Sequence, residues 1–228
     1  MKKFVCALML GVLASAGLCR AGNLRDGLIL YYNFSLALGA VVPDMSGHRH
    51  PGAMQNGAKT VPGGVCGRAA QFDGVNDIVA AGNLGYQPKG TISFWMNADS
   101  LDGHRAALST YPIWDQDLRF EGDATGAFAV GLGPILGGRL LMSDMKPHTW
   151  YQVTFAWTTN SFTGWLNGQK VFTGTHDNQL FLNFSSVTVG NGYSTEPERY
   201  WMGLIDEVRI YNRVLSDAEV SSLYTARP

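Results

Sequence analysis

The chain closes with the stretch Gly203-Leu204-Ile205-Asp206-Glu207-Val208-Arg209-Ile210-Tyr211, and Leu215-Ser216-Asp217-Ala218-Glu219 follows it after a short break. Residues 203–211 alternate side chains in the manner of a β-strand. Ser216 followed three residues later by Glu219 is a capping box, which predicts that a short helix begins here. We expect this helix to pack at the edge of a sheet, because Val220 and Leu223 continue one apolar face.

Asp206 is the unusual residue of this predicted strand. Strict alternation places it on one face with Leu204, Val208 and Ile210, and places Glu207 on the other face with Ile205, Arg209 and Tyr211. A buried carboxylate needs a partner, since an unpaired charge on an apolar face is strongly unfavourable. The partner is expected to be a set of backbone N–H groups, an arginine, or Ca²⁺, which prefers oxygen ligands. Asp44 and Asp206 are the candidate ligands if the cofactor is Ca²⁺.

Similar short runs recur through the rest of the chain, at residues 28–34, 91–96, 139–142 and 151–157. Residues 162–166 and 169–172 flank Asn167-Gly168, the pair that supplies the two positive-φ positions of a type I′ hairpin turn. The 28 glycines lie mainly between these runs, and none of the runs has a sustained helical period. Short strands separated by glycine-rich turns predict an all-β sandwich or barrel in one domain.

The order of these stretches resembles the laminin-G-like jelly-roll domains of the concanavalin-A-like lectin and glucanase superfamily. Besides residues 203–219, the resemblance rests on YYNF at 31–34, DMSG at 44–47, AQFDGVND at 70–77, TISFW at 91–95, WYQV at 150–153 and WLNG at 165–168. It implies a jelly-roll sandwich of two antiparallel sheets with one short C-terminal helix. It also implies that ligands are held on the concave face of one sheet or at the loops along its edge.

The first residues predict a secretory signal peptide. Lys2-Lys3 precedes an apolar run over residues 4–14 that is too short to span a bilayer, and cleavage sites follow at 14–16 and 19–21. We favour cleavage after Ala21, which divides the chain into a signal peptide at 1–21 and a jelly-roll domain at 22–228. No later apolar run is long enough to insert in a membrane, so the predicted location is secreted, periplasmic or at the cell surface.

Removal of residues 1–21 leaves 14 basic and 18 acidic residues, a net charge near −4. This balance argues against nucleic acid as a partner. Cys6 and Cys19 leave with the signal peptide, so Cys66 remains alone; cleavage after Ala16 would instead keep Cys19 available for a bridge to Cys66.

The sequence does not predict catalysis. The resemblance implies that glucanases of this fold carry a Glu-x-Asp-x-x-Glu strand, and this chain has no such pattern. The nearest candidates are Asp115, Asp117 and Glu121, which share one face with Arg119 if the segment is a strand, and their types and order do not match. The chain is therefore expected to be a binding module and not an enzyme, with glycoside hydrolysis as the weakest alternative.

The candidate ligand-binding residues are Trp114, Arg119, Glu121 and Tyr193. Trp114 and Tyr193 lie in turn-rich stretches, where an aromatic ring is able to stack on a sugar, and the alternative is that such rings simply pack beneath long loops. The expected partner is a glycan or glycoprotein, and the alternative is an adhesion module that contacts another protein. A groove lined by aromatic and planar polar side chains favours the first, and a flat apolar patch favours the second.

Overall fold

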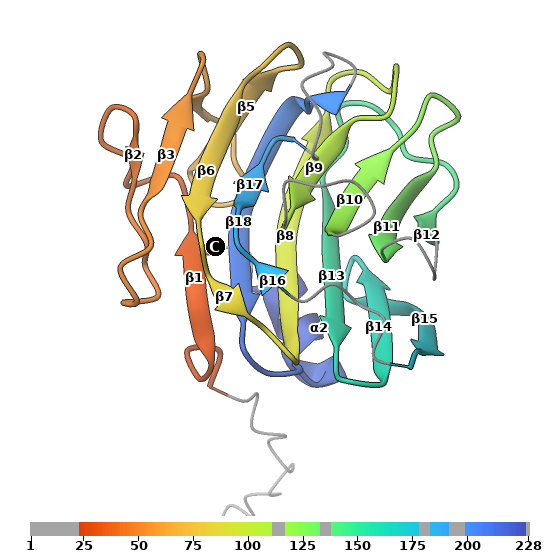
Figure 1. Ribbon diagram of the computed structural model, residues 1–228. Helices are drawn as coiled ribbons and strands as arrows, with labels where there is room; N and C mark the ends of the chain where they lie inside the picture. The colour runs from red at the N-terminus through yellow and green to blue at the C-terminus, as the bar shows by residue number, and fades with distance from the viewer. Residues whose placement is uncertain (1–22, 111–116, 133–137, 178–182, 192–198, 227–228) are drawn as a thin grey trace, which may run out of the picture.

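The computed structural model describes residues 23–110, 117–132, 138–177, 183–191 and 199–226. Strands in these residues form two large antiparallel sheets that lie face to face, which confirms the predicted all-β jelly-roll sandwich (Figure 1). We call them the β8 sheet and the β10 sheet, after a central strand of each.

The β8 sheet has the strand order β15-β14-β13-β8-β18-β5-β4, and β1 also pairs with β18. The bounds are β1 (Leu28–Tyr32), β4 (Lys59–Pro62), β5 (Arg68–Asp73), β8 (Gly90–Ala98), β13 (Tyr151–Trp157), β14 (Ser161–Leu166), β15 (Gln169–Thr175) and β18 (Met202–Tyr211). Because β1 pairs with the last strand of the chain, the two ends of the described domain are held in one sheet.

The β10 sheet has the order β12-β11-β10-β9-β17-β6-β3-β2. The bounds are β2 (Val41–Val42), β3 (Gly52–Gln55), β6 (Ile78–Gly82), β9 (Ala106–Ser109), β10 (Leu118–Gly122), β11 (Phe128–Leu132), β12 (Gly138–Met142) and β17 (Val187–Val189). A separate pair joins β7 (Gly85–Tyr86) to β16 (Asn183–Phe184).

The core fills the space between the two sheets. Phe94 of the β8 sheet meets Phe120 of the β10 sheet edge to face, with ring centroids 5.2 Å apart and an interplanar angle of 85°. Phe155 of β13 makes a second edge-to-face contact with Phe120 at 6.2 Å. Since all three rings are fully buried, these aromatic contacts hold the sheets together through area burial and favourable ring geometry.

Two local predictions are confirmed. Asn167 and Gly168 both have positive φ, 52° and 75°, and join β14 to β15 as the predicted hairpin. Helix α2 (Asp217–Thr225) begins at a capping box in which Ser216 caps the Glu219 N–H and the Glu219 side chain caps Ser216.

The predicted position of this helix is only partly right, because Asp217 of α2 does contact Lys170 of the edge strand β15 but the helix also lies over the face of the sheet. Helix α2 covers the outer face of the β8 sheet, away from the core, where Val220 and Leu223 pack with Trp165 of β14. Trp95 on the same face stacks on Tyr224 of the helix, with centroids 5.5 Å apart and planes 14° from parallel. The large side chains on this face of the sheet explain the difference, because a helix over them buries more apolar surface than a helix at an edge.

The predicted alternation along β18 is also wrong. Ile205, Val208 and Ile210 all face the core, which strict alternation does not allow. The register against β8 shifts between Asp206 and Arg209, and Glu207 has a φ of 54°, as in a β-bulge. The extra residue turns Asp206 away from the face that carries Val208 and Ile210, and it leaves Glu207 on the outer side with Arg209.

Candidate ligand-binding site

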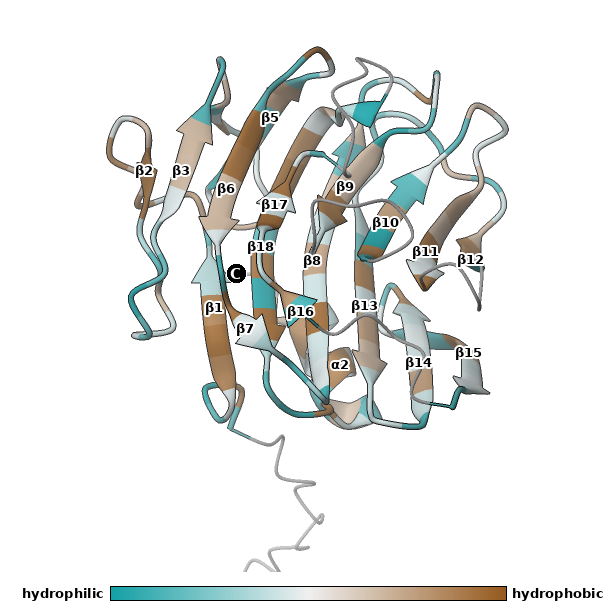
Figure 2. Ribbon diagram, in the orientation of Figure 1, coloured by the Kyte–Doolittle hydropathy of each residue, from teal (hydrophilic) through white to brown (hydrophobic). Residues whose placement is uncertain are grey.

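Strand β10 places Arg119 and Glu121 on the outer face of the β10 sheet. Leu118 and Phe120 are fully buried in the core, so the alternate residues point the other way. Figure 2 shows hydrophilic positions on β10 between the hydrophobic stretches of β9 and β11. Strand β10 therefore places Arg119 and Glu121 on one face, as the sequence pattern predicted.

Four side chains form a connected set on this face, which we call the arginine cluster: Asp117, Arg119, Glu121 and Arg199. Arg119 Nη1 donates to Asp117 Oδ1 at 3.0 Å, and its Nε lies 2.9 Å from Glu121 Oε2. Arg199 Nη1 approaches the same Glu121 oxygen at 3.4 Å. Two guanidinium groups and two carboxylates thus alternate along the cluster.

The cluster is shielded from solvent although it lies outside the core. Arg119 is 8% exposed and Asp117 is 1% exposed, whereas Glu121 and Arg199 are half-buried. Gly131 on β11 leaves room for Arg119, because a Cβ there would lie 3.3 Å from Arg119 Nη2. In this setting the guanidinium and carboxylate groups interact more strongly than exposed ion pairs do.

The polar character of the face extends to the neighbouring strands. Ser109 of β9 lies opposite Arg119, and Thr188 of β17 lies opposite Ser109. Trp114 and Tyr193 fall outside the described residues, in 111–116 and 192–198. In sequence those segments adjoin Asp117 and Arg199, the two ends of the cluster.

Asp117 and Arg199 are the members that sequence reasoning did not select as ligand-binding residues. The sequence pattern indicates Asp117 only as a candidate carboxylate for hydrolysis. Arg199 had no signal, because its contact with Glu121 joins residues 78 positions apart.

The candidate metal ligands are both surrounded by hydrogen-bond donors. Asp44 accepts the N–H groups of Tyr31, Ser46 and His50 and the Ser46 hydroxyl. Asp206 Oδ2 accepts the Cys66 N–H at 3.0 Å, and its Oδ1 accepts the Glu207 N–H at 2.8 Å. Backbone N–H groups, one of the partners expected for Asp206, are therefore present. Within the described ranges no group of three or more His, Cys, Asp or Glu side chains is placed to hold a metal ion, so calcium stays a prediction.

The two carboxyl groups differ in their proton affinity. Burial raises the pKa of Asp206 to about 7, with the negative charge of Glu207 adding to it and the N–H donors opposing it. Burial would also raise the pKa of Asp44, but its hydrogen bonds outweigh that effect and hold the pKa below its ordinary value. Both residues fix loops to the β8 sheet.

Among the described residues, no helix has the length and apolar character needed to cross a membrane.

Comparison with known proteins agrees with the observed architecture. The family model described as "Concanavalin A-like lectin/glucanases superfamily" matches residues 73–221. No curated protein is similar enough in sequence to match this chain.

Solved structures with the same fold include parts of three different proteins. Domain 4 of an extracellular arabinanase from Geobacillus stearothermophilus, in complex with arabinotriose, is 19% identical, has a TM-score of 0.65, and is matched over 87% of this chain and 98% of that one. The binding domain of Paraclostridial Mosquitocidal Protein 1 is 17% identical, with a TM-score of 0.70 over 90% of this chain and 53% of that one. Trypanosoma rangeli sialidase in complex with sialic acid is 17% identical, with a TM-score of 0.68 over 87% of this chain and 32% of that one. At these identities the likeness concerns the fold.

Proposed function

Because this chain belongs to the Concanavalin A-like lectin/glucanases superfamily, we propose that it is a non-catalytic module that binds a glycan, free or on a glycoprotein, at the arginine cluster. The observation that carries the proposal is the position of this cluster. Its charged side chains lie on the outer face of a sheet and take no part in the hydrophobic core. Two of them, Asp117 and Arg119, are nevertheless almost fully buried.

The chemistry of the cluster suits a polyhydroxylated ligand. A guanidinium group offers several N–H donors in one plane, and a carboxylate offers acceptors, so Arg199 and Glu121 together match neighbouring sugar hydroxyls. Both are more exposed than Arg119 and Asp117. Arg119 holds Glu121 through one ion pair, and Glu121 in turn pairs with Arg199. Arg199 and Glu121 are therefore the proposed contacts, with Trp114 and Tyr193 as proposed stacking residues.

The same contacts favour binding over hydrolysis. Glycosidases need one carboxyl group that stays protonated as a general acid and a second that acts as base or nucleophile. Here the carboxylates of Asp117 and Glu121 both pair with the single guanidinium of Arg119, so neither is set apart to act as an acid or a base. This arrangement suits a ligand-binding role, and the predicted signal peptide would place that role outside the cytoplasm.

A second candidate function, contact with another protein, has one observation in its favour. Leu36, Leu38 and Val41 are each at least 50% exposed, and Leu38 and Val41 are bridged across a tight turn. Exposed apolar side chains that gather on one surface often mark an interface.

A glycan panel combined with two substitutions tests the proposal. Binding of immobilised oligosaccharides is measured for the wild-type chain and for Arg199→Gln and Glu121→Gln, which change half-buried rather than fully buried groups. We expect each substitution to weaken glycan binding by about tenfold or more, since a charge-assisted hydrogen bond contributes about 1.5–3 kcal/mol.

Lys170→Gln is the matched control, because Lys170 is a surface cation in an ion pair on the β8 sheet. It should leave glycan binding unchanged. Absence of binding to every glycan, or equal losses in Lys170→Gln and Arg199→Gln, would refute the proposal. Glycan-independent capture of a protein that is lost on Leu38→Glu would favour the second candidate.

A further inference from the structure

A pocket of about 380 Å³ lies on the outer face of the β8 sheet, beside α2. The arginine cluster lies on the outer face of the other sheet, so the two sites are on opposite sides of the sandwich. The volume falls within the range of small-molecule sites, about 300–1,000 Å³. The apolar part of its lining comes from Leu24, Leu28, Met45, Val65, Trp95 and Leu223.

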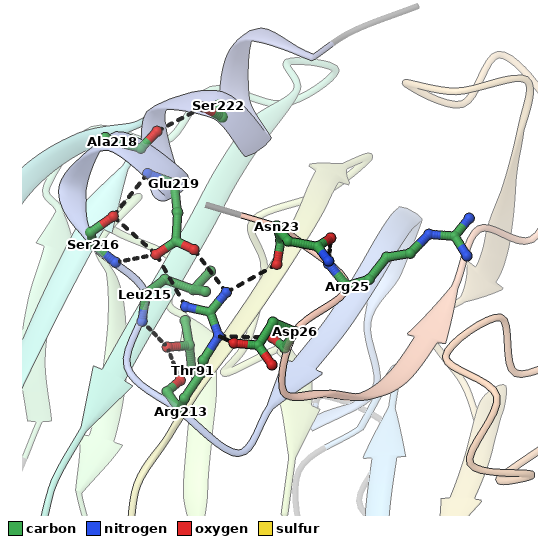
Figure 3. A network of polar contacts seen from close by, with 10 residues as sticks. All are labelled: Asn23, Arg25, Asp26, Thr91, Arg213, Leu215, Ser216, Ala218, Glu219 and Ser222. Atoms are coloured by element: carbon green, nitrogen blue, oxygen red, sulfur yellow. Dashed lines mark hydrogen bonds and ion pairs between the residues drawn. The ribbon is translucent and has the colours of Figure 1, made fainter. Parts of the chain in front are cut away.

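The walls of the pocket are fixed in place by Arg213 (Figure 3). Its guanidinium donates to both Glu219 oxygens of α2, at 3.1 and 2.7 Å. It also donates to the carbonyl oxygens of Asp26 at 2.7 Å and Asn23 at 3.3 Å. Residues 23–26 and α2, which both contribute to the lining, are thereby held at a set separation.

The polar groups at the floor of the pocket satisfy one another. The Tyr31 hydroxyl donates to Glu207 at 2.9 Å, and Glu207 also forms an ion pair with Arg209. The Arg209 guanidinium lies 4.1 Å from the centre of the Tyr31 ring. Burial raises the pKa of Tyr31 and of the Cys66 thiol, so both stay neutral at pH 7.

The apolar walls select against a sugar. A sugar carries hydroxyls over its whole surface, and the apolar walls would leave most of them without hydrogen bonds. A hydrocarbon chain has no hydrogen bonds to lose when it packs against the same walls, and its binding removes apolar surface from water. The body of a fitting ligand is therefore aliphatic.

Arg25 is a charged residue of the lining that takes no part in the ion pair between Glu207 and Arg209. It is exposed at the pocket, and within the described part of the chain its guanidinium makes no ion pair. In Figure 3 its side chain points away from the Arg213 network. An exposed guanidinium in the lining of a largely apolar pocket complements a carboxylate head group.

We propose that this outer pocket binds an aliphatic carboxylate, with the hydrocarbon chain against Trp95 and Leu223 and the carboxylate at Arg25. The inference is independent of glycan binding, because it rests on a different face of the molecule and on a different ligand chemistry.

Protection of Cys66 tests the proposal directly, since Cys66 is a free cysteine in the lining of the pocket. Cys6→Ser and Cys19→Ser in the full chain leave Cys66 as the only thiol. The rate of maleimide labelling is then measured with dodecanoate below its micelle concentration, with dodecanol, and with acetate. We expect dodecanoate at ten times its dissociation constant to slow labelling about tenfold, as mass action requires, and acetate to have no effect.

Two pairs of variants test separately the contribution of the carboxylate head group and that of the apolar walls to binding. Arg25→Gln should weaken dodecanoate binding about fivefold or more and leave dodecanol unaffected, whereas Lys146→Gln removes an exposed cation away from the pocket and should change neither. Met45→Glu places a negative charge in the lining and should weaken dodecanoate binding, whereas Val41→Glu alters a residue outside it, and the two residues are 43% and 50% exposed.

Labelling that dodecanoate does not slow would overturn the proposal, and so would equal losses in Met45→Glu and Val41→Glu. Equal binding of dodecanoate and dodecanol that Arg25→Gln does not change would overturn the assignment of the carboxylate to Arg25. A rise in melting temperature with dodecanoate, absent in Met45→Glu, is the second readout that the proposal requires.

Discussion

At Glu219, one carboxylate closes the capping box of α2 and also binds Arg213. The Arg213 guanidinium, together with the Ser216 donors, lowers the pKa of Glu219 to about 2 against the opposing effect of burial. A folded-state pKa below the ordinary value means that the ionised form stabilises the fold. This stabilisation is fully present above about pH 4.5 and is lost as the pH falls toward 2.

Glu219→Gln should therefore lower the free energy of unfolding by about 2–3 kcal/mol at pH 7 and by little near pH 2. Urea unfolding at pH 7, 4.5 and 3 measures the difference. Asp217→Asn is the control, because Asp217 is a neighbouring carboxylate whose ion pair with Lys170 is mostly exposed. Its effect should stay below about 1 kcal/mol. A Glu219→Gln effect that is the same at every pH would contradict the assigned role.

At the scale of elements, the sequence predicted those features that depend on neighbours along the chain. The capping box and the Asn167-Gly168 turn involve residues within a few positions of each other, and both were confirmed. The bulge in β18 was missed because it depends on pairing with β8 and on the N–H of Cys66, 140 residues away from Asp206. The alternation of side chains along a strand cannot reveal the extra residue of a bulge when its partners are so far away along the chain.

The β14–β15 hairpin contains two cross-strand pairs in which an aromatic ring covers a glycine. Gly164 lies opposite Phe172, and Phe162 lies opposite Gly174. A Cβ at either glycine would lie 2.4 Å from the facing ring. Gly164→Ala and Gly174→Ala should therefore each destabilise the protein by about 1–3 kcal/mol through overpacking, measured by denaturant unfolding.

Gly138 is the matched control for both substitutions. It lies in a strand, has no positive φ, and a Cβ there would meet its nearest neighbours at 3.8 Å. Gly138→Ala should change stability little, and a loss as large as that of Gly164→Ala would show that the facing rings are not the cause.

At the scale of the whole molecule, the two outer faces of the sandwich have different chemistry. The β10 sheet carries the arginine cluster, and the β8 sheet carries α2 and the apolar outer pocket. Arg119 and Glu121 could be selected from the sequence, since two residues on one strand face share a period of two. Their connection to Arg199, and the meeting of residues 23–26 with α2 at the pocket, required the folded arrangement.

Calcium provides a test of how the whole domain is held together. Asp44 and Asp206 each fix a loop to the β8 sheet, and each already accepts backbone N–H groups. A cation approaching these oxygens would have to displace N–H donors that carry partial positive charge. We therefore expect the melting temperature to be the same in calcium and in chelator, because a ligand raises it only by binding the folded state.

Asp44→Ala should lower the melting temperature equally in both solutions, since it removes acceptors from three N–H groups. A melting temperature that falls in chelator for the wild-type chain but not for Asp44→Ala would instead establish Asp44 as a calcium ligand, one of the alternatives that the sequence left open.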